Sequence, residues 1–138
     1  MENTNRSSSN AVYALRLQIV FVTKYRKPVL NEEIRADLKA AFAEIAQAWR
    51  CTLLEFGAEE DHVHVLLDIH PALNLSTLIN NLKSASSKRI RGKHCNWLRH
   101  FYSKPVLWHR AYYVGSVGGA TLETVRAYVE AQGKGKAP

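Results

Sequence analysis

The chain has 138 residues, of which 46% are hydrophobic and 22% charged, so it is long enough and apolar enough to bury one hydrophobic core. This composition excludes a disordered chain, a collagen-like repeat and a coiled coil, and no apolar run is long enough to span a membrane. The net charge is +7, and because residues 69–122 carry eight Lys or Arg and no Asp or Glu, we expect an anionic partner, with nucleic acid first.

The first half of the chain predicts a strand, a helix and a hairpin. Residues 1–10 are small and polar, and we expect them to form a disordered tail. Residues 13–23 are rich in branched and aromatic side chains and predict a long strand. Asn31 precedes two glutamates and an apolar pattern with helical spacing, which predicts a helix that is capped at Asn31. Two short strands, 51–56 and 62–69, then predict a hairpin around a turn at 57–61.

The second half predicts two further helices and one strand. Asn74 or Ser76 begins a helix that Gly92 ends, and a short helical turn follows. Residues 106–114 are β-prone and aromatic and predict a further strand. The next glycines predict a flexible hinge before a last helix capped by Thr121; these are Gly115, Gly118 and Gly119.

The order β-α-β-β-α-β predicts an α+β protein with a ferredoxin-like antiparallel sheet, to which a C-terminal helix is appended. We expect a single domain over residues 11–133 and a loose tail at 134–138. The N-terminus has no apolar segment behind a basic start, which argues against a signal peptide. Because Cys51 and Cys95 have no CxxC spacing, we expect reduced thiols in a cytoplasmic protein.

The first candidate site is the pair His62 and His64. Residues two apart on a strand point to the same face, so both imidazoles can bind one metal ion. An amphipathic strand that uses histidines as its polar residues is the alternative, since six histidines make one such pair unremarkable.

The second candidate is Tyr128 with Gln132 on the last helix. A spacing of four residues places both side chains on one helical face. The amide oxygen of Gln132 suits a hard divalent ion, and the phenol of Tyr128 can act as a nucleophile. Core packing of the tyrosine is the alternative interpretation.

The basic stretch supplies candidate DNA contacts. Cations in such a run contact phosphates, and hydroxyl or amide groups bind backbone or bases, although a solvated helix face is the alternative. The predicted contacts are Lys83, Ser87, Lys88, Arg89, Arg91 and Lys93, with Lys24 and Arg110 in addition. Five aromatic residues could stack on unpaired bases or belong to the core: Trp97, Tyr102, Trp108, Tyr112 and Tyr113.

Four segments together resemble the HUH-type single-tyrosine transposases of small bacterial and archaeal insertion sequences. The segment VTKYRKPVL resembles their N-terminal signature, EDHVHVLLDI their histidine strand and LINNLKSASSKRIR their DNA-binding helix. The segment YYVGSVGGATLETVRAYVEAQ resembles their last strand, hinge and tyrosine helix, with Gly118 and Gly119 at the hinge. The resemblance covers residues 11–133, and the segments occur in the expected order.

This resemblance implies a transposase that binds the hairpin-forming ends of an insertion sequence as single-stranded DNA. His62, His64 and Gln132 are the implied ligands of a divalent ion, Mg²⁺ or Mn²⁺, and Tyr128 is the implied nucleophile, which forms a 5′-phosphotyrosine. The resemblance also implies a homodimer whose sites combine the histidines of one subunit with the tyrosine helix of the other. Such a protein works in the cytoplasm, at the nucleoid when it is bound to DNA, without a membrane partner.

Two other functions remain open at this point. One is a non-catalytic ferredoxin-like module that binds single-stranded nucleic acid, which explains the charge and the fold but gives His62, His64 and Tyr128 no role. The other is a domesticated HUH nuclease that acts on palindromic repeats in the genome.

Overall fold

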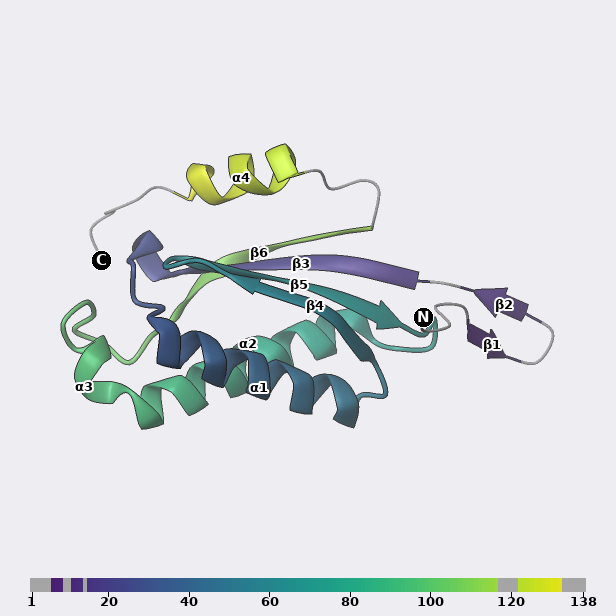
Figure 1. Ribbon diagram of the computed structural model, residues 1–138, viewed down its shortest axis with the longest axis horizontal. Coiled ribbons are helices and arrows are strands. Elements are labelled where there is room, and N and C mark those ends of the chain that lie inside the picture. Colours follow the sequence, from purple (N-terminus) through teal and green to yellow (C-terminus); the bar gives the residue numbers. More distant parts are fainter. Residues whose placement is uncertain (1–5, 9–10, 14, 117–121, 133–138) are drawn as a thin grey trace.

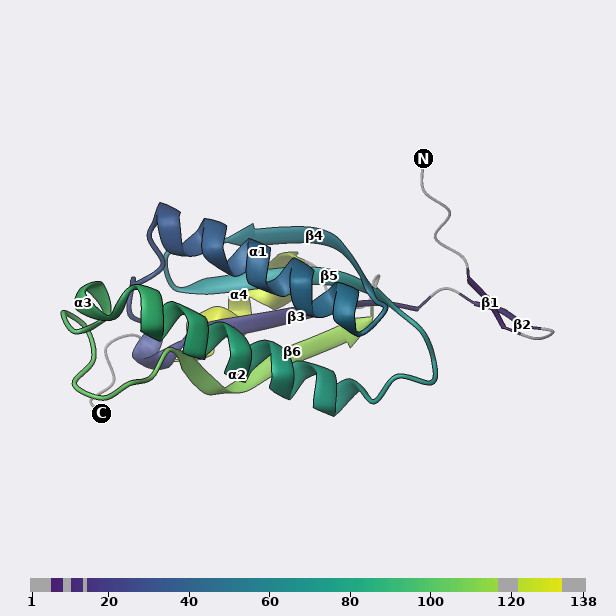
Figure 2. The same ribbon diagram turned by 90° about the horizontal axis from the view of Figure 1, so that it is seen from below.

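The computed structural model describes residues 6–8, 11–13, 15–116 and 122–132, and four of its strands form one antiparallel sheet. In sheet order these strands are β4 (Thr52–Ala58), β5 (His62–Ile69), β3 (Leu15–Thr23) and β6 (Trp108–Ser116). Two helices, α1 (Glu32–Ala48) and α2 (Leu75–Lys93), lie side by side on one face, and α4 (Leu122–Ala131) lies on the other (Figure 1, Figure 2). The predicted α+β fold with an antiparallel sheet is confirmed.

Both long helices begin at the asparagine caps that the sequence predicts. The Asn31 side-chain oxygen accepts a hydrogen bond from the backbone N–H of Ile34 at 2.9 Å. The Asn74 oxygen likewise accepts from the N–H of Thr77 at 3.1 Å. Each cap satisfies one of the four N–H groups that a helix start leaves without a partner. At its other end α2 runs through Gly92 to Lys93, one residue past the predicted stop, and α3 (Cys95–Leu98) follows.

The core lies between the sheet and the helices α1 and α2. Phe21 of β3 is fully buried there, and its ring centroid lies 5.8 Å from that of Phe42 in α1 and 5.6 Å from that of Trp108 in β6. Burying an aromatic or branched side chain of this kind stabilises the fold by about 1.5–3 kcal/mol. Other fully buried core residues are Ile19, Ile34, Leu38, Val63, Leu78, Ile79, Leu82 and Ile90.

The second face of the sheet carries a smaller apolar cluster that holds α4. Val20 and Val22 of β3 are fully buried against Val129 of α4, with the rings of Tyr113 and Tyr128 packed beside them. Successive side chains of β3 point to opposite faces of the sheet. Ile19 and Phe21 point to the main core, whereas Val20 and Val22 point to α4. This second layer brings the C-terminal helix over the strand that carries the histidines.

Several other features differ from the sequence prediction, including the starts of β3 at Leu15 and of β6 at Trp108. Strand β4 continues through Gly57 and Ala58, where the sequence predicts a turn, because these residues pair with His64 and Val63. Gly115 belongs to β6, where it pairs with Gln18, and not to a hinge. β1 (Arg6–Ser8) lies within residues 1–10, which the sequence predicts to be disordered, because it pairs with β2 (Ala11–Tyr13) in a two-stranded ribbon.

Several predicted features lie outside the described residues: the hinge residues Gly118 and Gly119, the cap Thr121 and the tail 134–138. Within the described part of the chain, neither Cys51 nor Cys95 forms a disulfide, in agreement with the predicted thiols. No helix in that part combines the length and hydropathy needed to cross a membrane.

Candidate functional site

The two histidines of β5 lie on the face of the sheet that α4 covers. Val63 and Val65 are buried on the α1 and α2 side, whereas His62 and His64 alternate with them and are half-buried. Across the ladder, His64 pairs with Val20 of β3, which belongs to the apolar cluster beneath α4. The strand therefore presents both imidazoles on one face, as their spacing predicts.

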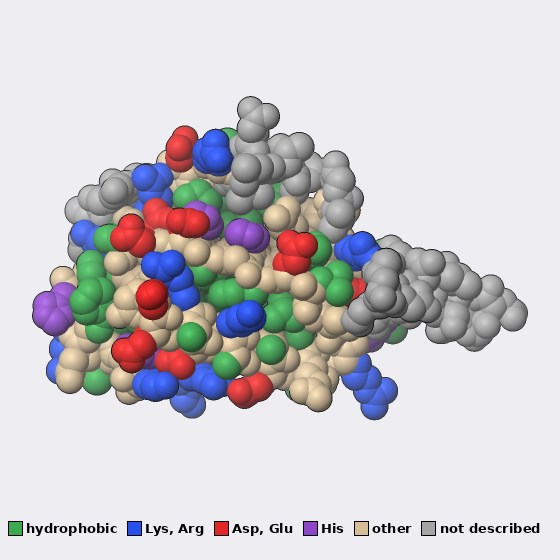
Figure 3. Space-filling view, in the orientation of Figure 1, with side chains coloured by type: hydrophobic (Ala, Val, Ile, Leu, Met, Phe, Trp, Pro, Cys, Tyr) green, Lys and Arg blue, Asp and Glu red, His purple; other side chains and the backbone are tan. Residues whose placement is uncertain are grey.

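Both histidines line a cavity of about 350 Å³ between the sheet and α4. We call it the histidine cavity; its lining residues are Arg26, Glu59, Asp61, His62, His64, Arg126, Val129 and Glu130. Figure 3 shows two neighbouring histidine side chains with acidic side chains beside them on the surface below the uppermost layer. Imidazole nitrogens and carboxylate oxygens are typical ligands of divalent ions, so the chemistry of the lining suits a metal.

Asp61 fixes the orientation of His62. Its Oδ1 lies 2.9 Å from Nδ1 of the His62 ring, a contact that favours a proton on Nδ1 and leaves Nε2 free as a ligand. The other carboxylate oxygen of Asp61 lies 3.3 Å from Nε of Arg26, an ion pair whose N–H is not aligned for a hydrogen bond. Arg26 also donates through Nη1 to the backbone carbonyl of Val129 at 3.4 Å, which links this pair to α4.

His64 lies against the backbone of the neighbouring strand. A Cβ atom built on Gly57, its partner in β4, would collide with Cε1 and Nε2 of the imidazole, so the ring occupies space that any side chain at position 57 would fill. Burial, reinforced by the charge of His62, lowers the pKa of His64. A neutral imidazole is the form that binds metal, so this environment favours a ligand role at neutral pH.

Tyr128 does not line the histidine cavity of its own chain. Its ring centroid lies 5.8 Å from that of Tyr113, and its hydroxyl is buried with no hydrogen-bond partner among the described residues. Burial raises the pKa of the Tyr128 phenol. Gln132 is likewise absent from the lining. The residues of α4 that line the cavity are Arg126, Val129 and Glu130. The structure thus brings the two histidines together, whereas Tyr128 of α4 and Gln132, which follows the helix, are not among the residues that line their cavity.

The histidine pair needs a further ligand. Among the described residues no group of three or more His, Cys, Asp and Glu is arranged to hold a metal ion. Two neutral imidazoles alone leave most of the coordination sphere of a hard cation open. A third ligand of another type, or one from a second chain, would complete the set.

The predicted DNA contacts of α2 divide between two sides of the helix. Lys83 donates to the backbone carbonyl of Arg110 in β6 at 2.6 Å, and Arg91 donates to the hydroxyl of Ser87 within α2 at 3.0 Å. Arg91 and Ser87 each line a cavity together with residues of the loop before β6. Lys83 and Ser87 also line a cavity with Trp108, whose indole N–H bonds Ser86.

The remaining predicted contacts lie elsewhere. Arg89 and Lys93 form ion pairs with α1, to Glu44 and Asp37, both at 3.2 Å. Lys88 and Arg110 are exposed, and Lys24 lines a separate cavity. Of the candidate stacking residues, Tyr102 and Trp108 belong to the core, Trp97 is exposed, and Tyr112 and Tyr113 are half-buried.

Three residues near the site escape sequence reasoning. The sequence places Gly57 in a turn, because no local signal shows that it pairs with His64 of the next strand. Tyr25 and Arg26 both adopt left-handed backbone angles, with φ of 58° and 54°, which non-glycine residues rarely do and which no local sequence signal announces. Such outliers cluster at functional sites.

Comparison with known proteins gives a consistent result along the whole domain. A family model described as "Transposase IS200 like" matches residues 11–132. The transposase for insertion sequence element IS200 of Salmonella typhimurium (strain LT2) is 28% identical over 127 residues, which cover 92% of this chain and 82% of that protein. The ISDra2 transposase TnpA of Deinococcus radiodurans is 27% identical over 121 residues, 88% of this chain and 86% of that protein.

Solved structures are similar in fold. A crystal structure of a Deinococcus radiodurans R1 protein described as a transposase superposes with a TM-score of 0.86 at 27% identity, covering 94% of this chain and 98% of that one. A REP-associated tyrosine transposase bound to a REP hairpin superposes with a TM-score of 0.55 at 11% identity, covering 91% of this chain and 69% of that one. At that identity the second match concerns the fold alone.

Proposed function

Because this chain belongs to the IS200-like transposase family, we propose that it cleaves and rejoins single-stranded DNA at the hairpin-forming ends of an insertion sequence through a covalent tyrosine intermediate. The observation that carries this proposal is the histidine cavity, in which His62 and His64 share one face of β5 beneath the helix that bears Tyr128. A module that only binds nucleic acid gives no reason for two half-buried imidazoles beside an oriented carboxylate.

His62 and His64 fit a divalent ion, since Asp61 leaves Nε2 of His62 free and burial lowers the pKa of His64, which favours its neutral form. The amide oxygen of Gln132 is the proposed third ligand, and Mg²⁺ or Mn²⁺ is the proposed metal. When bound, the ion supplies Lewis-acid polarisation of a phosphate oxygen. The carboxylate of Asp61 would hold the ligand geometry through its contact with His62.

Tyr128 is the proposed nucleophile. Its phenolic oxygen loses its proton and attacks phosphorus, the bond from phosphorus to the 3′ oxygen breaks, and that oxygen leaves with a proton as a 3′-hydroxyl. The 5′ phosphate remains joined to the tyrosine, so attack by another 3′-hydroxyl reverses the step without an energy source. Because Tyr128 packs on Tyr113 and is not among the residues that line the histidine cavity of its own chain, we propose a homodimer in which α4 serves the partner's histidines.

Covalent capture of DNA tests this function. Single-stranded DNA that carries the ends of the element, labelled in turn at its 5′ and 3′ termini, is incubated with the protein and Mg²⁺ or Mn²⁺ and resolved on a denaturing gel. We expect a retarded band only with the label on the 3′ side of the break, because the protein keeps the 5′ phosphate. Cleavage without any retarded band, or cleavage undiminished by EDTA, would contradict the proposal.

Gly57→Ala should impair metal binding while leaving the fold intact. The new Cβ would occupy the position of the His64 ring, which can rotate away at little cost to stability because it is the end of a side chain. Changing a residue that holds a metal ligand in position lowers metal affinity or activity about 10- to 100-fold. When the cleavage rate is measured against Mn²⁺ concentration, the concentration that gives half-maximal cleavage should therefore be higher in the variant.

Gly92→Ala is the matched control, since a Cβ at that position of α2 meets nothing within 4 Å. Alanine favours a helix over glycine by about 1 kcal/mol, so this variant should melt slightly higher than the natural protein and cleave normally. An unchanged Mn²⁺ midpoint in Gly57→Ala would mean that His64 binds metal from another rotamer or not at all.

A further inference from the structure

A second cavity adjoins the histidine cavity on the other side of the turn η1 (Lys24–Arg26). Arg26 lines the histidine cavity, whereas its neighbours in the sequence line the second one, which has a volume of about 310 Å³. We call it the lysine pocket; its principal lining residues are Lys24, Tyr25, Lys27, Phe101, Tyr102 and Lys104. Its volume is at the lower end of the roughly 300–1,000 Å³ typical of ligand pockets.

The backbone between the two cavities is held in an unfavourable conformation. Tyr25 and Arg26 both have positive φ, which costs on the order of 1–3 kcal/mol per residue. Such a conformation persists only where the surrounding structure enforces it. Here the buried Thr23 hydroxyl lies 2.8 Å from the carbonyl of Lys27, and the Tyr102 hydroxyl donates to the carbonyl of Lys24 at 2.7 Å. The turn is thus fixed with Arg26 at the histidines and Tyr25 in the lysine pocket.

The lysine pocket combines positive charge with an aromatic wall. Three ammonium groups and no carboxylate occur among the described residues that line it. Tyr25 and Phe101 are half-buried, so each ring keeps surface available for contact, and Lys24 lies 5.3 Å from the centroid of Tyr25. This is the composition of a single-strand binding site, in which cations follow the phosphates and rings accept bases.

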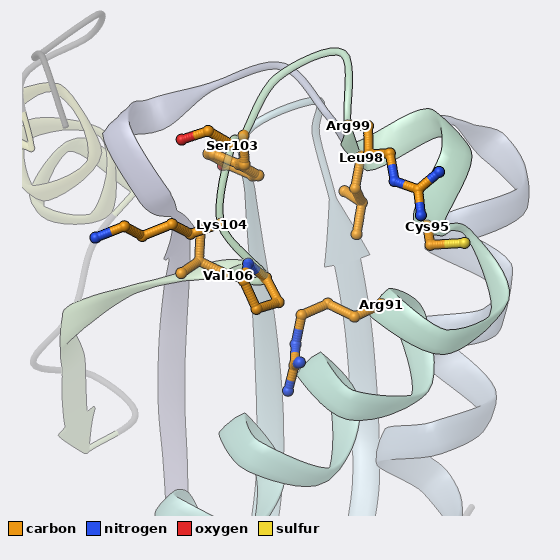
Figure 4. A pocket seen from close by; sticks show the side chains of 9 residues that line it. Arg91, Cys95, Leu98, Arg99, Ser103, Lys104 and Val106 are labelled. Atoms are coloured by element: carbon orange, nitrogen blue, oxygen red, sulfur yellow. The ribbon is translucent and has the colours of Figure 1, made fainter.

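The positive surface continues around the loop 103–106. An adjacent cavity of about 210 Å³ contains Arg91 and Arg99 and likewise has no acidic residue in its described lining. In Figure 4, Arg91 is directed from α2 toward this loop, whereas Lys104 extends away from Arg91 on the other side. A polynucleotide that follows the loop would meet Arg91 and Arg99 on one side of the loop and the lysines of the lysine pocket on the other.

We propose that the lysine pocket binds one nucleotide of single-stranded DNA, with the base against Tyr25 and Phe101 and the adjoining phosphates at Lys27 and Lys104. The strand would then pass over η1, so that the neighbouring phosphate reaches the histidine cavity. This inference rests on the proposed function in that the nucleotide belongs to the DNA that is cleaved. The pocket holds the strand, and its residues take no part in bond breaking.

Non-covalent binding tests the pocket without requiring cleavage. The probes are an eight-nucleotide oligo(dT) and an eight-unit abasic strand with the same phosphates, both fluorescently labelled, and affinities are measured by anisotropy. The natural protein should bind oligo(dT) roughly five- to a hundredfold more tightly than the abasic strand, the range expected for stacking of one base. Tyr25→Asn should lose most of this preference and keep the affinity for the abasic strand. Asparagine tolerates positive φ, so the turn is preserved while the ring is removed.

Tyr25→Phe restores the ring and should recover the preference, and Lys104→Gln should weaken both probes. Ultraviolet crosslinking of the natural protein to strands that contain 5-iododeoxyuridine gives a measurement that is independent of variant folding, and the crosslinks should map to Tyr25 or Phe101. Equal affinity of the natural protein for both probes, a preference that survives in Tyr25→Asn, or crosslinks that map only elsewhere would overturn the pocket. A failed covalent capture with these results intact would overturn only the proposed cleavage.

Discussion

Replacing Tyr128 with phenylalanine should abolish the covalent protein–DNA adduct and leave DNA binding in place. The substitution removes the phenolic oxygen, the proposed nucleophile, and loss of a nucleophile lowers the rate by about a thousandfold or more. The fold should not suffer, because the Tyr128 hydroxyl is buried without a hydrogen-bond partner among the described residues. Removing it should leave the free energy of unfolding unchanged or raise it by up to about 1 kcal/mol. A denaturing gel and a thermal melt measure the two effects.

Tyr113→Phe is the matched control for this experiment. Tyr113 lies in β6, and its ring packs on that of Tyr128. Each variant therefore removes one phenolic hydroxyl from the same pair of aromatic rings. We expect Tyr113→Phe to form the adduct at close to the natural rate. Adduct formation by Tyr128→Phe would show that the nucleophile is another residue, and loss of the adduct in Tyr113→Phe alone would identify Tyr113 in its place.

Mixing two inactive variants should restore cleavage. The first variant carries His62→Ala and His64→Ala, and the second carries Tyr128→Phe. In a dimer whose helices serve the partner, a mixed dimer holds one site with intact histidines and an intact tyrosine. Random exchange of subunits at equal concentration would restore about a quarter of all sites. The expectation follows from α4, which presents Arg126, Val129 and Glu130 to the histidine cavity of its own chain, whereas Tyr128 packs on Tyr113 and does not line that cavity.

Two measurements accompany the mixing experiment. Native mass spectrometry of the mixture shows whether mixed dimers form, and a single chain that carries all three substitutions, mixed with either parent, should stay inactive. Mixed dimers without any cleavage would mean that each chain uses its own tyrosine, and the chemistry assigned to Tyr128 would survive that result.

Local sequence signals predicted most of the fold. The caps at Asn31 and Asn74 are readable because the capping oxygen and the N–H that it accepts lie three residues apart. The strand of His62 and His64 is equally readable, since alternation of polar and apolar residues needs no information from the rest of the chain.

The surroundings of the site could not be predicted in this way. The sequence predicts the hairpin, but it does not show that β4 continues through Gly57 and brings this backbone against the His64 ring. Tyr25 adopts a left-handed conformation only because Thr23 and Tyr102 hold the turn. Arg89 and Lys93 are typical of a DNA-binding stripe in sequence, yet carboxylates of α1 already pair with them. Each of these facts depends on how neighbouring strands, turns and helices contact one another, which a single local pattern does not encode.

The ion pairs between α1 and α2 influence how DNA arrives. Asp37 and Glu44 offset the charges of Lys93 and Arg89 on that flank, whereas the cavities around the loop 103–106 contain cations and no acidic residue in their described lining. Among the described residues, cations therefore outnumber carboxylates around this loop, and their field would turn the molecule toward DNA before contact. Steering of this kind acts on the association rate and weakens once the screening length shortens to about 8–10 Å at physiological salt. The dissociation rate depends on the contacts made after arrival, including those proposed for Lys27 and Lys104.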